Sequence, residues 1–250
     1  MDEILQKIRI VLVGTTHPGN IGATARAMKV MGLERLYLAA PQARFPSAKA
    51  TAMATSADDL LEKAVVTENL LEAISGCGLV LGTTARLRSL PLPVTDPRTA
   101  SRRVAAEAGT YEIAIVFGRE NSGLSNDETR LCHQLINIPT SREYHSLNLA
   151  QAVQVVTYEL HMTLLGESPG DVDPPDWVPE PAEKMEFYYQ RLEQTLLAIG
   201  FMNPDQPKRL MQRLRRLYQR ARPDENELNI LNGILSATLE AARGRRSRDN

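Results

Sequence analysis

The chain has 250 residues and a mass of 27.7 kDa, which is enough for one or two domains with a sizeable hydrophobic core. Hydrophobic residues make up 43% of it and charged residues 24%, and this balance excludes a disordered tail, a collagen-like repeat and a disulfide scaffold. The longest apolar runs, such as Ile10 to Val13, have the length of strands, so we expect no membrane span. The acidic start resembles no signal peptide, and two cysteines are too few for a disulfide framework. We therefore expect a cytoplasmic protein with free thiols.

The first 165 residues alternate short apolar runs with helix-like segments, a pattern typical of an α/β domain with a mostly parallel sheet. The runs lack polar alternation, as buried parallel strands do. The predicted strands are Ile8 to Val13, Leu36 to Ala39, Leu79 to Leu81, Ile113 to Phe117 and Leu135 to Ile138. The predicted helices are one capped by Asn20 and ending near Gly32, one over Glu68 to Ile74, one beginning at Ser125 and one over Leu147 to Leu165.

The remaining chain has a different composition. Residues 166 to 182 are rich in proline and acidic residues and read as a linker. Leucines and other apolar residues then recur at helical spacing three times, which predicts a small all-helical domain over residues 183 to 250. The three apolar sets are Met185, Tyr188, Leu192, Leu196 and Ile199; Leu210, Leu214 and Leu217; and Leu228, Leu231, Leu235 and Leu239. The predicted organisation is therefore a domain over 1 to 165, a linker and a helical extension.

The net charge of −1 hides an uneven distribution along the chain. Residues 208 to 222 contain seven basic residues and no acidic one, and Arg243, Arg245, Arg246 and Arg248 form a second cluster. The pattern fits either an anionic partner or a solvated helix face.

Several familiar sites are excluded by their missing motifs. The glycines of residues 14 to 22 do not fit the dinucleotide-binding pattern G-x-G-x-x-G, and no phosphate-binding G-x-x-x-x-G-K-[ST] occurs. The four histidines and two cysteines show no metal-ligand spacing, so we expect no metal.

Four polar, glycine-rich segments follow predicted strands, where open α/β sheets bind their ligands. They span residues 17 to 26, 82 to 86, 118 to 125 and 144 to 150. Each alone would be read as a turn. Together they resemble the motifs of the SPOUT superfamily, specifically of its TrmH-like ribose 2'-O-methyltransferases. The matching residues are Asn20-x-Gly22-x-x-Ala25-Arg26, Phe117-Gly118-Arg119-Glu120-x-x-Gly123-Leu124 and Ser146-Leu147-Asn148-Leu149-Ala150.

This resemblance covers residues 7 to about 162, and it implies a trefoil-knotted α/β domain that binds S-adenosylmethionine. Within the family, the chain is most similar to enzymes that methylate the ribose at position 32 of the tRNA anticodon loop; the helical tail is similar only in placement and character. The cofactor positions carried over are Thr83, Thr84, Ala85, Gly118, Ile138, His145, Ser146 and Leu147. Gly118 is expected to let the backbone approach a purine closely.

The resemblance gives Arg26 the central catalytic role, supported by Asn20, Glu120, Ser146 and Asn148. A guanidinium is too basic to act as the proton acceptor, so we expect Arg26 to bind phosphate and stabilise the developing alkoxide. The family also implies a homodimer and a tRNA partner. The RNA contacts expected besides Arg26 are Lys208, Arg209, Arg213, Arg215, Arg216, Arg220 and Arg222, with Leu210, Leu214 and Leu217 facing inward.

Three other functions remain open from the sequence. The chain could methylate another tRNA position or ribosomal RNA, because the motifs specify the chemistry and not the nucleotide. It could bind RNA without turnover, or be a nucleotide-using α/β enzyme of another kind. The base preferred at the methylated nucleotide is not encoded in any recognisable motif.

Overall fold

The structure is a computed structural model that describes residues 2–85, 92–141, 143, 146–166, 178–204 and 209–246. It divides into two compact units, Met1–Asp176 and Trp177–Asn250. Each unit has its own hydrophobic core. Most of the predicted linker, residues 167–177, lies outside the described residues. No helix in the described part of the chain is long and apolar enough to cross a membrane.

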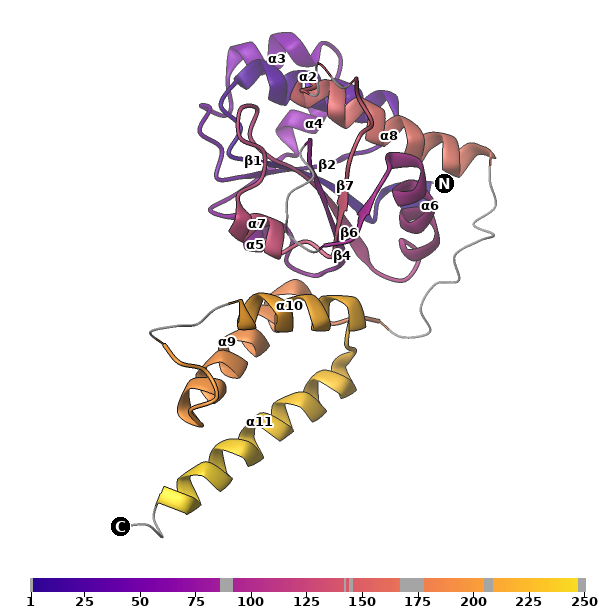
Figure 1. The fold of residues 1–250 in the computed structure, drawn as a ribbon. Coiled ribbons are helices and arrows are strands. Elements are labelled where there is room, and N and C mark those ends of the chain that lie inside the picture. The colour runs from indigo at the N-terminus through magenta and orange to yellow at the C-terminus, as the bar shows by residue number, and fades with distance from the viewer. Residues whose placement is uncertain are drawn as a thin grey trace. The chain divides into compact units, whose positions relative to one another are not determined.

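The first unit is built on a seven-stranded sheet in the order β3-β2-β1-β6-β4-β7-β5 (Figure 1). Every pairing in it is parallel. The strands are β1 (Ile8–Val13), β2 (Arg35–Ala39), β3 (Val65–Thr67), β4 (Cys77–Thr83), β5 (Val94–Thr95), β6 (Glu112–Phe117) and β7 (Gln134–Ile136). The predicted α/β class is confirmed, whereas the trefoil knot stays a prediction.

The five strands predicted from apolar runs are the five inner ones, and β1 is buried at all six positions. The sequence missed β3 and β5, which form the two edges of the sheet. β3 exposes Val65 and Val66, and β5 has two residues. Edge strands this short carry too little periodicity to be recognised in a sequence.

Helices connect the strands of the first unit. α2 packs against α3 and α8, and α8 also packs against α6 (Figure 1). The helices are α1 (Asp2–Leu5), α2 (Pro18–Val30), α3 (Ala48–Ala54), α4 (Asp58–Glu62), α5 (Leu70–Ala73), α6 (Pro97–Glu107), α7 (Asn126–Arg130) and α8 (Leu149–Gly166). Ser125 caps α7 as predicted, in a capping box with Glu128.

The predicted cap of α2 was wrong. The helix begins at Pro18, with His17 at the cap position and Asn20 inside the first turn. Proline suits this first position because its fixed φ is helical and its missing N–H has no partner there anyway. The Asn20 side chain is therefore free of the capping role, and it makes hydrogen bonds with Glu120 and Asn148 instead.

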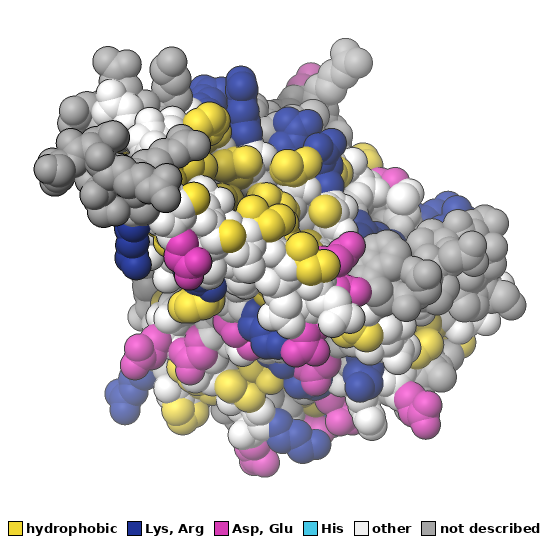
Figure 2. Space-filling model, turned by 90° about the horizontal axis from the view of Figure 1, so that it is seen from below, with side chains coloured by type: hydrophobic (Ala, Val, Ile, Leu, Met, Phe, Trp, Pro, Cys, Tyr) yellow, Lys and Arg dark blue, Asp and Glu magenta, His cyan; other side chains and the backbone are white. Residues whose placement is uncertain are grey.

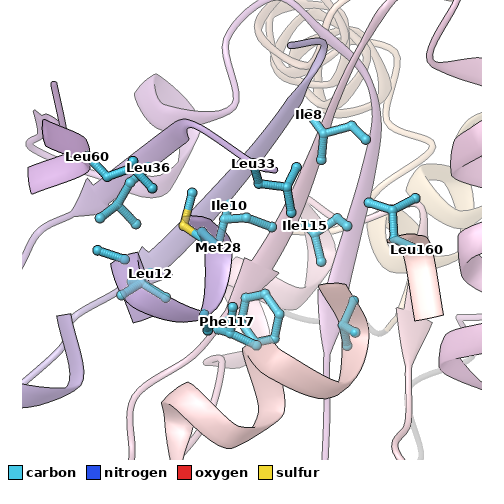
Figure 3. Close-up of a cluster of buried hydrophobic side chains, with 14 of the residues drawn as sticks. Ile8, Ile10, Leu12, Met28, Leu33, Leu36, Leu60, Ile115, Phe117 and Leu160 are labelled. Atoms are coloured by element: carbon cyan, nitrogen blue, oxygen red, sulfur yellow. The ribbon is translucent and has the colours of Figure 1, made fainter. Parts of the chain in front are cut away.

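The core of the first unit lies where the sheet meets its helices (Figure 3). Ile8, Ile10 and Leu12 of β1 are fully buried, as are Met28 of α2 and Leu38 of β2. Burying one such side chain contributes about 1.5 to 3 kcal/mol. This core holds the sheet rigid, so the loops at its ends have a fixed base.

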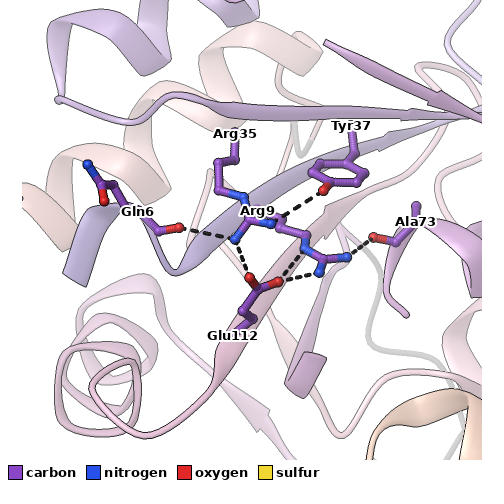
Figure 4. A network of polar contacts seen from close by, with 6 residues as sticks. All are labelled: Gln6, Arg9, Arg35, Tyr37, Ala73 and Glu112. Carbon is purple, nitrogen blue, oxygen red and sulfur yellow. Dashed lines mark hydrogen bonds and ion pairs between the residues drawn. The ribbon is translucent and has the colours of Figure 1, made fainter. Parts of the chain in front are cut away.

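A charged network ties three strands together at their amino ends (Figure 4). Glu112 at the start of β6 accepts hydrogen bonds from Arg9 of β1 and, at 2.7 Å, from Arg35 of β2. Arg9 also donates to the carbonyl of Ala73 at 3.0 Å and lies over the ring of Tyr37. Burial raises the pKa of Glu112, but the hydrogen bonds from Arg35 and Arg9 outweigh it and keep that pKa below its ordinary value.

The described residues of the second unit form three helices, as predicted. They are α9 (Ala182–Ala198), α10 (Leu210–Ala221) and α11 (Glu225–Arg246). Their core consists of Met185, Tyr188, Tyr189, Leu192, Leu228 and Leu235. The inward position predicted for Leu217 was wrong, because 47% of it is exposed. Met211, Leu214 and Tyr218 form the inward face of α10 instead, at positions separated by three and four residues.

Candidate functional site

The carboxyl ends of β4, β6 and β7 lie at one edge of the parallel sheet and surround a cavity of about 290 Å³. This volume is at the lower end of the range for small-molecule sites, roughly 300 Å³ and more. Seven of the predicted cofactor residues line it: Thr83, Thr84, Ala85, Gly118, Ile138, Ser146 and Leu147. The eighth, His145, lies outside the described residues. Three chain segments distant in sequence thus meet at one cavity.

Hydrogen bonds between neighbouring strands fix one wall of the cavity. The amide of Thr84 donates to the carbonyl of Ile136 at 2.9 Å, and Asn137 Nδ2 donates to the carbonyl of Thr84 at 2.8 Å. The Thr83 hydroxyl donates to the carbonyl of Val116 at 3.1 Å. With these groups already paired, the backbone after β4 has a defined position before any ligand arrives.

Gly118 has a structural explanation that differs from the one expected. A Cβ at this position would lie 2.2 Å from backbone atoms of Gly123 and Leu124. The loop folds back on itself there, since the backbones of Arg119 and Gly123 exchange hydrogen bonds of 3.2 and 2.9 Å. The loop's own backbone therefore requires glycine at 118, whether or not a ligand approaches.

An ion pair holds the same loop against α7. Arg119 donates two hydrogen bonds to the carboxylate of Glu128, at 2.9 and 2.8 Å, and Glu128 also accepts from the Ser125 amide at 2.7 Å. Donating these hydrogen bonds to Glu128 raises the pKa of Arg119. Gly14, with φ of +59°, leaves room for the guanidinium, because a Cβ there would lie 2.6 Å from Arg119 Nε. The sequence did not assign roles to Arg119 or Glu128.

Glu120 joins the first and second motifs. Its carboxylate accepts hydrogen bonds from the amide and hydroxyl of Thr16 at 3.1 and 2.9 Å, from the His17 amide at 3.3 Å and from Asn20 Nδ2 at 2.9 Å. Burial raises the pKa of Glu120, but these hydrogen bonds outweigh it and leave the pKa below its ordinary value. Glu120 is therefore an ionised acceptor at neutral pH, with its oxygens already engaged.

Asn20 is also hydrogen-bonded to the third motif. Its Oδ1 accepts a hydrogen bond from Asn148 Nδ2 at 3.1 Å, and Asn148 Oδ1 accepts from the Ala150 amide at 3.0 Å, in the first turn of α8. The three predicted motifs thus form one chain of hydrogen bonds, Glu120 to Asn20 to Asn148. Thr16 belongs to this chain as well, and no sequence motif pointed to it.

Arg26 lies six residues, about one and two-thirds turns, beyond Asn20 on α2 and is exposed. Within the described residues its guanidinium has no hydrogen bond or ion pair. Neither Arg26 nor the pair Asn20 and Asn148 lines the cavity, whereas Glu120 and Ser146 do. The predicted catalytic residues therefore have three different settings. Glu120 and Ser146 line the cavity, Asn20 and Asn148 form a hydrogen-bonded chain beside it, and the charge of Arg26 is open to solvent.

The second unit presents arginines on one side of α10. Arg209, Arg213 and Arg220 are exposed and Arg216 is half-buried. Arg215 points the other way: it donates two hydrogen bonds of 2.6 Å to Glu186 and lies over the Tyr189 ring. Arg222 ends the helix with φ of +52°, and Lys208 lies outside the described residues. Four of the seven predicted basic contacts thus share one face.

Among the described residues, no group of three His, Cys, Asp or Glu side chains could hold a metal ion. Both cysteines are buried. Burial raises the pKa of Cys132 to about 12, so its thiol is protonated at neutral pH.

The parallel sheet, the cavity at its carboxyl edge and the hydrogen-bonded motifs around that cavity define an α/β protein with a small-molecule site. Comparison with known proteins specifies the class further. Residues 7–158 match the SpoU rRNA Methylase family, and residues 183–247 match the C-terminal domain of the tRNA methyltransferase TrmJ. The chain belongs to the SpoU methylase family.

Relatives match over nearly the whole chain. A tRNA (cytidine/uridine-2'-O-)-methyltransferase TrmJ from Salmonella choleraesuis is 47% identical over 244 residues, covering 97% of this chain and 100% of the relative. The crystal structure of TrmJ from Z. mobilis is similar with a TM-score of 0.80 and 34% identity, covering 92% of this chain and 97% of that one. A probable methylase family protein from Haemophilus influenzae has a TM-score of 0.63 and 39% identity, over 98% and 100% of the two chains.

Proposed function

We propose that this protein transfers a methyl group from S-adenosylmethionine to the ribose 2'-hydroxyl at position 32 of the tRNA anticodon loop. The observation that carries the proposal is that the second and third motifs line one cavity and the first motif is hydrogen-bonded to both of them. Curated relatives that match nearly the whole chain are named tRNA 2'-O-methyltransferases. A tRNA substrate also fits the cytoplasmic location expected from the sequence.

The cavity residues fit the cofactor. Residues 83 to 85, 118, 138 and 146 to 147 line a space that has both polar and apolar surface, as a nucleoside joined to an amino acid through a sulfonium requires. When bound, S-adenosylmethionine supplies a methyl group on a sulfonium. The paired backbone of Thr84 and the ion pair of Arg119 with Glu128 keep the walls in place, so little ordering is needed on binding.

The chain's own residues would then orient the RNA. Arg26 holds a phosphate and stabilises negative charge on the ribose oxygen as its proton leaves to a phosphate oxygen or water. Asn20 and Asn148 are held by Glu120 and by the start of α8, so their amide groups are preorganised beside the cavity. Ser146 lies on the cavity wall. Glu120 itself is a poor base, because its pKa is lowered and its oxygens are already paired.

The arginine face of α10 would supply phosphate contacts to the tRNA. Arg209, Arg213, Arg216 and Arg220 have no ion pair within the described residues, so their charges are available to a polyanion. Arg215 belongs to the internal pair with Glu186 and is left out of this proposal. The anticodon loop is an accessible target, since single-stranded loops expose ribose and base edges.

We also propose the homodimer that the family resemblance implies. It is supported by α8, where Tyr158, Met162 and Leu165 are 47%, 44% and 57% exposed at spacings of four and three residues. Full activity in a sample diluted to monomers would contradict a dimeric active unit.

The decisive experiment is methyl transfer from labelled S-adenosylmethionine to transcribed tRNA, with the product mapped for 2'-O-methylation. A parallel tRNA carries a 2'-deoxy nucleotide at position 32. We expect label at that ribose and none in the deoxy control. Cofactor binding without transfer to tRNA would indicate that the substrate is another RNA. Absence of cofactor binding as well would favour a non-catalytic RNA-binding protein.

A further inference from the structure

The long helix α11 has one face inside the second unit and an apolar face outside it. Leu228 and Leu235 are buried in the core, where α11 packs against α9. On the other side Ile230 and Ile234 are 63% and 56% exposed. Such exposure of two isoleucines one helical turn apart is costly in water unless something covers them. Figure 2 shows that exposed hydrophobic side chains also gather on one face of the molecule.

Ile230 and Ile234 begin an exposed stripe along α11, and this stripe continues toward the carboxyl end with small residues. Ala237 and Ala241 are exposed, and a Cβ placed on Gly233 would meet nothing within 4 Å. Positions 230, 234, 237 and 241 are separated by four, three and four residues, which is the spacing of a coiled-coil seam. The stripe is therefore bulky in its first half and small in its second half.

This asymmetry makes the stripe complementary to itself in one orientation. If two copies of α11 run antiparallel about an axis between positions 235 and 236, Ile230 faces Ala241 of the second copy and Ile234 faces Ala237 of the second copy. Every layer then packs a large side chain against a small one, in the way that cores are best filled. A parallel pair would place isoleucine on isoleucine and leave gaps between the alanines.

The charges favour the same orientation. The first turn of α11 carries Glu225 and Glu227, and its last residues in the sequence include Arg243, Arg245 and Arg246. An antiparallel pair brings the acidic end of each helix to the basic end of the other, whereas a parallel pair would juxtapose like charges.

We propose that α11 pairs antiparallel with α11 of a second copy of this chain, through Ile230, Ile234, Ala237 and Ala241. Two helices touching over about three turns bury less than the roughly 1,000 Å² of a stable interface, so the contact adds to another that already holds the copies together. The proposal concerns a second interface and is independent of the methyl transfer reaction.

The test is disulfide trapping in the full chain with the double variant Ile230→Cys/Ala241→Cys. The two positions are about 16 Å apart on one helix, too far for a disulfide within a chain, which needs Cα atoms within about 7 Å. The native cysteines are buried and do not take part. We expect a covalent dimer on mild oxidation, with peptide mapping joining position 230 of one copy to position 241 of the other.

The matched control is Asn229→Cys/Glu240→Cys, an equally spaced and exposed pair about a quarter turn away from the stripe. It should give on the order of tenfold less covalent dimer, because its thiols are not held together. Adding Ile234→Asp to the first variant should lower its yield to the control level. Equal yields from the two pairs, or disulfides joining the two position-230 thiols, would overturn the proposal. Methyl transfer by the reduced variants, measured in parallel, reports whether they are folded.

Discussion

Glu120 behaves in this structure as an anchor. It accepts four hydrogen bonds from the loop before α2 and from Asn20, and it thereby connects the segments after β1 and β6. Even glutamine would replace glutamate poorly in this setting. Its side-chain amide would place an NH₂ donor where every neighbouring group also donates. The hydrogen bonds that Glu120 accepts thus explain why this position carries a carboxylate, independently of any role in the reaction.

Replacing Glu120→Gln should therefore lower both stability and turnover. We expect a loss of about 1 to 3 kcal/mol in the free energy of unfolding, from at least one buried donor left unpaired. Denaturant unfolding measures the stability, and methyl transfer to tRNA measures the effect of a displaced Asn20. The control is Glu143→Gln, which alters another carboxylate on the cavity wall. Identical behaviour of the two variants would contradict the anchoring role.

Arg26→Lys tests the planar guanidinium at the proposed phosphate contact. Lysine keeps the charge but cannot make two parallel hydrogen bonds to phosphate, so kcat should fall by about 100-fold. Stability should be unchanged because Arg26 is exposed. Arg44→Lys, at another exposed arginine, serves as the control. Near-normal turnover with a new pH dependence would show that bidentate positioning by Arg26 is wrong.

Glu112 predicts acid sensitivity of the sheet. Its folded pKa lies below the ordinary 4.5, so its contribution to stability is complete above pH 4.5 and is lost as the pH falls through the folded value. The free energy of unfolding should therefore decline below about pH 4.5. Glu112→Gln should be less stable at pH 7 and show a shallower decline. Unfolding curves collected between pH 7 and pH 3 measure the stability of both proteins and its decline with pH. Parallel pH profiles for the two proteins would show that Glu112 is not the source of the acid sensitivity.

At the scale of elements, α2 and α3 show why a motif glycine can be structural. A Cβ on Gly22 would lie 1.9 Å from the carbonyl oxygen of Ala50, because α3 packs directly on this face of α2. Gly19, one turn earlier, has only ordinary contacts at 3.5 Å and beyond. The two glycines look alike in the sequence, and only the packing of α3 separates them.

Gly22→Ala should consequently destabilise the protein by about 3 kcal/mol, since backbone must move to admit the methyl group. Gly19→Ala should be neutral or slightly stabilising, because alanine favours helix. Thermal or denaturant unfolding of the matched pair decides between them. Equal stabilities would mean that α3 shifts at no cost and that Gly22 is retained for another reason.

The sequence predicted the elements that have the clearest apolar patterns. The inner strands were recognisable from continuous apolar runs, and the helices α8 to α11 from apolar residues at helical spacing, although those of α10 are only partly buried. The edge strands β3 and β5, the start of α2 at Pro18 and the outward position of Leu217 were missed or misassigned, because local propensity does not report which neighbour an element meets. The same limit applies to the site: motifs identified Glu120 and Asn148, whereas Thr16 and the pair of Arg119 with Glu128 follow only from the fold.

At the scale of the whole molecule, the two units have separate cores and separate chemistry. The first unit contains the cavity and the hydrogen-bonded motifs, and the second carries the exposed arginines of α10. An ion pair inside the second unit, between Arg215 and Glu186, and the three packed tyrosine rings give it a core of its own. The division predicts that cofactor binding and RNA binding can be separated experimentally.

Removing residues 183 to 250 should weaken tRNA binding far more than binding of S-adenosylmethionine. Each lost phosphate contact reduces the slope of log affinity against log salt by about 0.9, or less on single strands, so loss of the four-arginine face should also flatten the salt dependence. Calorimetry for the cofactor and filter binding of tRNA at several salt concentrations give the two affinities. The quadruple alanine variant of Arg209, Arg213, Arg216 and Arg220 separates charge from folding, because it leaves the helical core intact. Equal loss of both affinities on truncation would instead mean that the second unit is needed for the first to fold.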